Sequence, residues 1–223
     1  MKAVKSVVRR SRKKQANQAN IKLNCDLGEG FGAYTMGCDE EIMPLIDSVN
    51  IACGFHGGDP SIIRQTVLLA KRHKVEMGAH VAYPDLQGFG RRSMNIRGQE
   101  LIDCIQYQIS ALDGMARTHG GRVTYVKPHG ALYNDINTDE ALERTVMHAV
   151  ASWHRPLELV RLATPRDKKS VETAFEYGLS LRFEAFADGG YPRAGYLVPR
   201  DKPGAVLDVA AAVAQAKAIA SGT

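Results

Sequence analysis

The chain places a histidine in nearly the same local setting three times: Gly54-Phe55-His56-Gly57, Gly78-Ala79-His80 and Lys127-Pro128-His129-Gly130. Each of these histidines follows a short apolar run and opens a loop rich in glycine, proline and aspartate. A fourth run, Ile21–Asp26, ends in a carboxylate that precedes Leu27-Gly28-Glu29-Gly30. Because α/β barrels build their active sites from polar groups at the carboxyl ends of several strands, the pattern predicts an enzyme.

Strand-like and helix-like segments alternate along the rest of the chain. The predicted buried strands are Ile21–Asp26, Val49–Cys53, Val75–Ala79, Val123–Lys127, Leu157–Leu162 and Leu179–Phe183. The predicted helices are one capped by Asp59, one that includes Leu101 and stops at Gly120-Gly121, one from Thr138 to Val150, Asp167–Tyr177, and Val209–Ala220, which is expected to pack on the sheet. The alternation predicts a parallel sheet, but periodicity alone does not distinguish a barrel from an open doubly wound sheet.

The composition is that of a globular protein whose basic charge is concentrated at one end. Seven of the 29 lysines and arginines, and none of the 24 acidic residues, lie within residues 1–20, which we interpret as a disordered tail. The remaining 22 basic and 24 acidic residues do not predict nucleic-acid binding. No apolar run approaches the ~20 residues of a membrane span. Four cysteines without paired spacing predict reduced thiols in a cytoplasmic protein.

Four long motifs resemble those of the LamB/YcsF family, and they occur in the family's order: Asn24–Gly32, Asn50–Pro60, Tyr83–Arg92 and Val126–Tyr133. The resemblance implies a (β/α) barrel of the glycoside hydrolase/deacetylase type, with seven strands in the family. The family continues into a last strand with a Val-His-Gly-Asp-Thr motif and a closing helix, whereas this chain ends at Thr223. We therefore expect one catalytic domain over residues 21–223, truncated at its C-terminus. Its open strand edges should favour self-association or partner binding, and loss of one wall of the site should lower its activity.

The resemblance also implies an activity, that of the A subunit of ATP-dependent 5-oxoprolinase. This enzyme hydrolyses the lactam 5-oxo-L-proline to L-glutamate, with ATP as a co-substrate and with partner subunits B and C. The sequence has no P-loop motif, so the ATP site is not evident in this chain. Two alternatives stay open. One is a metal-dependent deacetylase or amidohydrolase of carbohydrate or amide substrates, and the other is an inactive remnant that only binds a ligand or partner.

The catalytic candidates are the polar residues at the predicted strand ends: Asp26, Glu29, His56, His80, Lys127 and His129. The two carboxylates suit acid/base chemistry or water activation, and Asp26 with the three imidazoles forms a candidate site for a divalent metal such as Zn²⁺. Lys127 suits neutralisation of a substrate carboxylate or an oxyanion, or an ion pair with Asp26 or Glu29. The structural alternatives are histidines that bind loop backbone and a Glu29 that accepts hydrogen bonds from turn amides.

The candidates for substrate binding lie in the same motifs. Arg91 and Arg92 follow Gly88-Phe89-Gly90, and one of them is expected to hold a carboxylate through two hydrogen bonds. Asn24, Asn50 and Tyr133 complete the predicted set. Asp59 is interpreted as a helix cap and not as a catalytic residue.

Overall fold

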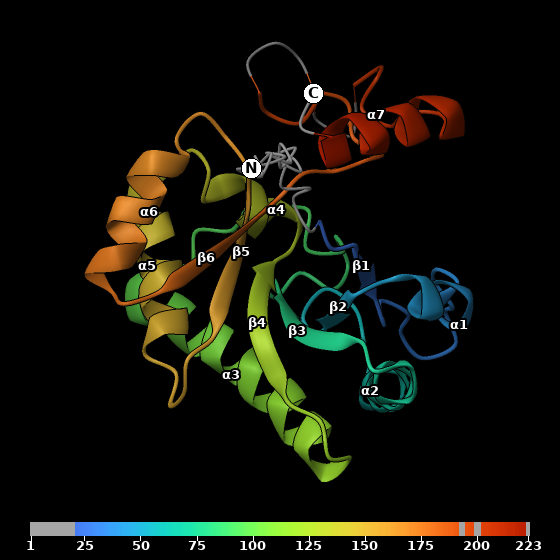
Figure 1. The fold of residues 1–223 in the computed structure, drawn as a ribbon. Helices are drawn as coiled ribbons and strands as arrows, with labels where there is room; N and C mark the ends of the chain where they lie inside the picture. Colours follow the sequence, from blue (N-terminus) through green and yellow to red (C-terminus); the bar gives the residue numbers. More distant parts are fainter. Residues whose placement is uncertain (1–20, 192–194, 199–201, 222–223) are drawn as a thin grey trace, which may run out of the picture.

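Six parallel strands form one sheet, and they follow each other across it in chain order (Figure 1). The computed structural model describes residues 21–191, 195–198 and 202–221, so the predicted tail lies outside the described residues. The strands are β1 (Asn24–Leu27), β2 (Ser48–Ala52), β3 (Glu76–Val81), β4 (Val123–Pro128), β5 (Glu158–Leu162) and β6 (Ser180–Glu184). All six predicted strands are confirmed, with shifts of up to three residues at their ends.

The helices follow the expected alternation with the strands. They are α1 (Asp39–Ile42), α2 (Pro60–His73), α3 (Gly98–Thr118), α4 (Gly130–Asp135), α5 (Glu140–Ala151), α6 (Asp167–Glu176) and α7 (Val209–Ser221), with a 3-10 turn η1 (Met43–Leu45). Asp59 caps α2 as predicted, because its Oδ1 accepts hydrogen bonds from the amides of Ser61 and Ile62. Helix α5 begins two residues after the predicted Thr138, because Asp139 is its cap and accepts from the Leu142 amide. The Thr138 hydroxyl instead donates to the Asp135 carbonyl.

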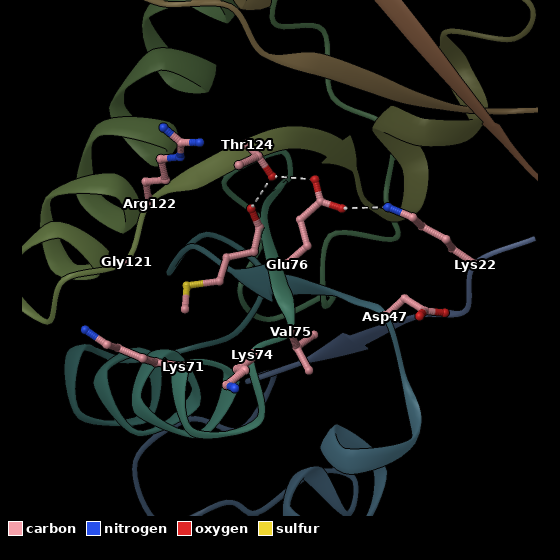
Figure 2. Close-up of a pocket in the computed structure, with 10 residues that line it drawn as sticks. Lys22, Asp47, Lys71, Lys74, Val75, Glu76, Gly121, Arg122 and Thr124 are labelled. Atoms are coloured by element: carbon pink, nitrogen blue, oxygen red, sulfur yellow. Dashed lines mark hydrogen bonds and ion pairs between the residues drawn. The ribbon is translucent and has the colours of Figure 1, made fainter. Parts of the chain in front are cut away.

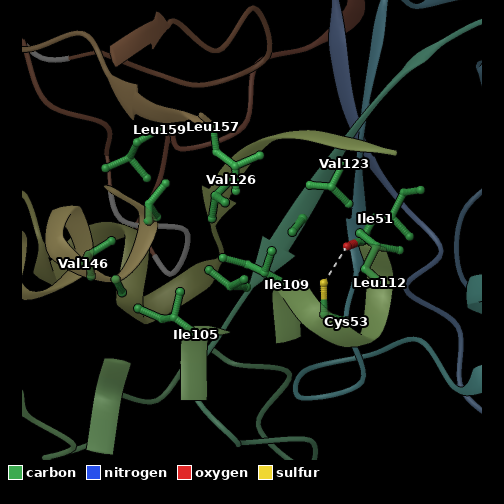
Figure 3. Close-up of a cluster of buried hydrophobic side chains, with 14 of the residues drawn as sticks. Ile51, Cys53, Ile105, Ile109, Leu112, Val123, Val126, Val146, Leu157 and Leu159 are labelled. Carbon is green, nitrogen blue, oxygen red and sulfur yellow. Dashed lines mark hydrogen bonds between the residues drawn. The ribbon is translucent and has the colours of Figure 1, made fainter. Parts of the chain in front are cut away.

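The apolar core lies between the sheet and the helices on its outer face. Figure 3 shows Ile105, Ile109 and Leu112 of α3 near Val123 and Val126 of β4, together with side chains from β2, α5 and β5. These five residues are all fully buried. Burying one such side chain stabilises the fold by roughly 1.5–3 kcal/mol. This packing holds the strands in place and thus sets the positions of the loops at their carboxyl ends.

The sheet curls into a half-barrel whose inner face carries polar side chains. Asn24 of β1 donates to Glu184 Oε2 of β6 at 3.0 Å, so the first and last described strands are joined by side chains. On the same inner face, Arg182 of β6 donates hydrogen bonds to Glu76 of β3. In the part of the chain that the structure describes, β1 pairs through its backbone only with β2, and β6 only with β5. The strand order and the curl agree with the barrel expectation, but these strands do not close a barrel.

Helix α7 forms where it was predicted but does not pack on the sheet. None of its residues is buried, and Figure 1 shows it apart from helices α2, α3, α5 and α6. It is held by Gln215, whose Nε2 donates to the carbonyls of Phe186, Ala187 and Gly189 at 2.8, 3.1 and 2.8 Å. Across the described ranges, no helix combines the length and the apolar character that a membrane crossing requires.

Candidate functional site

The three histidines of the repeated pattern meet at the carboxyl end of the sheet. His80 lies in β3, while His56 and His129 follow β2 and β4. The rings of His56 and His129 stack with centroids 3.7 Å apart, and His80 meets both rings edge-on. Glu29 Oε1, from the loop after β1, lies 3.0 Å from His56 Nε2 and 3.5 Å from His129 Nδ1. The predicted convergence of the three histidines is confirmed, and all three are buried.

Backbone carbonyls determine which nitrogens of two histidines carry protons. His80 Nδ1 lies 3.0 Å from the Lys127 carbonyl, and His129 Nε2 lies 2.9 Å from the Phe89 carbonyl. Because a carbonyl only accepts, both of these nitrogens must donate. The opposite nitrogens, His80 Nε2 and His129 Nδ1, then face each other 3.0 Å apart. Two lone pairs at this distance repel, so a proton or a cation must lie between them.

Burial favours the neutral state of His56 and of His129. Burial, together with the nearby His80, holds the pKa of His56 well below its usual value. Burial and the neighbouring histidines likewise lower the pKa of His129 to about 2. Neutral imidazoles can accept a proton or bind a metal, which a protonated ring cannot do.

Asp26 connects the histidines to a second polar group inside the curled sheet. Its Oδ1 accepts hydrogen bonds from Asn50 Nδ2 at 2.7 Å and from Lys127 Nζ at 3.0 Å. Its Oδ2 is thereby turned toward His80 Nε2, at 3.3 Å. Desolvation opposes ionisation of Asp26, but His80 and Lys127 outweigh it and hold its pKa well below the usual value. Asp26 is therefore an oriented, ionised carboxylate beside an imidazole.

Glu184 belongs to the same group, although it was not among the predicted site residues. Its Oε1 accepts from the Tyr133 hydroxyl at 2.8 Å and lies 3.2 Å from Lys127 Nζ. The sequence held a usable signal, because Glu184 directly follows the predicted strand Leu179–Phe183 and is thus a carboxylate at a strand end. We missed it because no glycine-rich loop with a histidine marks that position.

A cavity of about 690 Å³ opens over these groups at the carboxyl ends of the strands. Asp26, His80, Lys127 and His129 line its polar side, and Arg91 and Tyr133 also reach it. Its apolar wall includes Leu162, Phe186, Leu197 and Val198. The cavity therefore combines oriented polar groups with apolar walls, as sites for small molecules usually do.

A second cavity, of about 510 Å³, lies at the opposite end of the sheet. Figure 2 shows that Glu76 accepts a hydrogen bond from Thr124 there and forms an ion pair with Lys22. Lys71 and Arg122 also line this cavity. Among the described residues, no histidine lines this cavity. Lys71 and Lys74 lie there at the carboxyl end of α2, where cations are favoured by the helix dipole. The site chemistry therefore belongs to the first cavity.

The other predicted residues now have definite places. Arg92 binds Asp85 through Nε at 2.9 Å, so it holds its own loop, whereas Arg91 lines the cavity. Glu29 contacts imidazoles, in contrast to the alternative in which it accepts from turn amides. Lys127 pairs with Asp26, as one of its predicted alternatives required.

Four potential ligand atoms of the cluster lie within 4.8 Å of one another, on Glu29, His56, His80 and His129. Three imidazoles and one carboxylate suit Zn²⁺ or a similar cation. The predicted metal set contained Asp26; in the structure, Glu29 is the carboxylate of this group, and Asp26 lies beside it. Because a proton or a cation must lie between His80 Nε2 and His129 Nδ1, this donor set is compatible with a bound cation.

Comparisons with known proteins agree with one another. The model of a family described as the LamB/YcsF family matches residues 21–222. The chain is 54% identical to a 5-oxoprolinase A subunit of Pseudomonas fluorescens strain Pf0-1, over 92% of this chain and 82% of that protein. It is 53% identical to a 5-oxoprolinase A subunit of Chromohalobacter salexigens, over 90% of this chain and 80% of that protein. The crystal structure of a lactam utilization protein from Thermus thermophilus matches with a TM-score of 0.82 and 42% identity, over 89% of this chain and 80% of that one.

Proposed function

This chain belongs to the LamB/YcsF family, and on that premise we propose that it serves as the A subunit of an ATP-dependent 5-oxoprolinase. The reaction adds water across the amide bond of 5-oxo-L-proline: the C–N bond breaks, the carbonyl carbon gains the hydroxyl, and the nitrogen gains a proton. ATP is the co-substrate of this reaction, and the partner subunits B and C complete the enzyme. The proposal rests on the relatives that carry this name and on one observation: Asp26, His80 and His129 converge at the wall of an open cavity.

The chain's own residues can move the proton of the attacking water. Asp26 and His80 both line the cavity, and Asp26 Oδ2 lies 3.3 Å from His80 Nε2, which suits a general base and its orienting partner. Glu29 and His129 extend this group with further acceptors. Lys127 keeps Asp26 ionised and places positive charge near an oxygen that becomes negative.

Reconstitution tests this function directly. The full chain, the partner subunits, ATP and 5-oxo-L-proline should together release L-glutamate, and leaving out the chain or ATP should abolish its release. Formation of glutamate without this chain, or none with every component and with active partner subunits, would contradict the proposal.

Arg91 should bind the substrate carboxylate, and Arg92 should not. Arg91 lines the cavity, and its guanidinium carbon lies over the Phe89 ring, 5.2 Å from the ring centre. Arg91→Met should therefore raise KM for 5-oxoproline by about 10-fold or more, because a charge-assisted pair is lost. Arg92→Met is the matched control: it should lower the thermal midpoint, since Asp85 loses its partner, and leave KM within about 2-fold. Equal KM effects of the two variants would contradict the assignment.

A second candidate function is metal-dependent hydrolysis of an amide by this chain alone. The observation that favours it is the four-residue group Glu29, His56, His80 and His129. A bound Zn²⁺ would supply Lewis-acid activation of water, and the four residues would hold it. Calorimetric titration with Zn²⁺ should show one site per chain, which His80→Ala abolishes and which the control His73→Ala on the surface of α2 retains. A wild-type chain that takes up no Zn²⁺ in this titration would rule out this candidate.

The curled sheet also supports a structural proposal. We propose that its six strands form part of a (β/α) barrel of the glycoside hydrolase/deacetylase type. Their sequential parallel order and the Asn24–Glu184 bridge across the open side support this class.

The four cysteines are free thiols, which supports a cytoplasmic location for the reaction.

A further inference from the structure

We propose that Glu184 is a positioning residue that holds the Lys127 ammonium against Asp26 and thereby orients the proposed base. This inference rests on the proposed function for its catalytic meaning, but its geometry is independent of the substrate. Glu184 does not line the cavity, so it acts through residues that do.

The ammonium of Lys127 has three acceptors for its three protons. Its Nζ lies 3.0 Å from Asp26 Oδ1, 3.2 Å from Glu184 Oε1 and 3.4 Å from Asn24 Oδ1. The side chain is almost fully buried, so water does not replace a lost acceptor at low cost. Removing the Glu184 charge would leave the ammonium free to shift, and Asp26 Oδ1 would lose a fixed donor.

Both oxygens of Glu184 are themselves held in place. Oε1 accepts from the Tyr133 hydroxyl at 2.8 Å, and Oε2 accepts from Asn24 Nδ2 at 3.0 Å. The carboxylate therefore cannot rotate without breaking a bond to α4 or to β1. Its contacts bring β1, β4, β6 and α4 together at one point.

Aromatic rings restrict the ammonium on its remaining sides. Lys127 Nζ lies 5.1 Å from the centre of the Phe186 ring and 6.0 Å from that of Tyr133, both within cation–π range. Phe186 follows β6 by two residues, so the end of this strand supplies both a charge and a ring to the Lys127 site.

Glu184→Gln tests the proposal by comparing kcat with KM in the reconstituted complex. We expect kcat to fall about 10-fold or more with KM unchanged within about 3-fold, because orientation of the base matters in the transition state. In the Lys127→Met variant, adding Glu184→Gln should lower kcat by less than about 2-fold, because no ammonium is left for Glu184 to position. The matched control is Glu158→Gln. Glu158 lies in the neighbouring strand β5 and pairs with Arg182, so its substitution should leave kcat unchanged.

An activity-independent measurement separates this proposal from the proposed function. Labelling of lysines by an amine reagent, followed by peptide mass spectrometry, should show Lys127 protected in the wild type and labelled several-fold faster in Glu184→Gln, but not in Glu158→Gln. If Lys127 is labelled faster in Glu184→Gln but the reconstituted complex does not hydrolyse 5-oxoproline, Glu184 positions Lys127 and the proposed 5-oxoprolinase function is contradicted. Unchanged labelling, or full additivity with Lys127→Met, would overturn the role of Glu184.

Discussion

Replacement of Asp26 by asparagine is expected to lower kcat for 5-oxoproline hydrolysis by about 10²- to 10⁴-fold, the range of general acid/base catalysis. The amide keeps the shape of the side chain and one oxygen that can still accept from Lys127 and Asn50. It places an NH₂ donor where Oδ2 faces His80 Nε2 at 3.3 Å, so it cannot take a proton. Steady-state kinetics of the reconstituted complex would measure the loss.

The matched control for this change is Asp59→Asn. It also replaces a carboxylate by an amide, but at the N-cap of α2, where the remaining oxygen can still accept from the amides of Ser61 and Ile62. The hydrogen bond from the Gly32 amide to Oδ2 is lost, and it lies outside the histidine cluster. We expect its kcat to remain within about 2-fold of the wild type, since no reacting group is touched. If the Asp26→Asn variant had a kcat as high as that of the Asp59→Asn control, Asp26 would not take part in the reaction.

Replacement of Lys127 by methionine is expected to damage both stability and turnover. The ammonium lies between Asp26 and Glu184, and these carboxylates raise its pKa in spite of burial. Breaking a buried ion pair by removing one partner costs about 3–5 kcal/mol. The lower end applies here, because the Asp26 side chain is one-third exposed and water can reach it. Urea unfolding would measure this loss, and kcat of the remaining folded protein should fall about 10²–10³-fold.

The contrast for this variant is an exposed lysine. Lys169→Met removes a lysine that pairs with Glu140 on the surface, where ion pairs contribute roughly 0–1 kcal/mol. Its unfolding midpoint and turnover should match the wild type. Equal unfolding free energies for Lys127→Met and Lys169→Met would show that the buried cation does not stabilise the fold.

Much of the architecture could be predicted because it depends on local sequence. Apolar runs of about six residues identify buried strands, and Asp59-Pro60 marks the start of α2. The placement of His56, His80 and His129 also followed from sequence, because the carboxyl ends of parallel strands lie at the same edge of a sheet. The position of α7 did not follow, since an alanine-rich helix has no strongly apolar face to specify its partner.

The sequence by itself therefore determined the alternation of strands and helices, the parallel sheet that follows from it, and the end of the sheet at which the polar residues gather. The order of the strands across the sheet came from the tertiary structure. The tertiary structure alone decided which atoms meet there. Glu184 joins the site because the curl of the sheet brings β6 to Asn24, 160 positions earlier in the chain. Arg92 is engaged by Asp85, whereas Arg91 lines the cavity, although the two are neighbours in sequence. The physical reason is that strand patterns depend on periodicity over a few residues, whereas hydrogen bonds depend on positions to within a few tenths of an ångström, which only the packed fold provides.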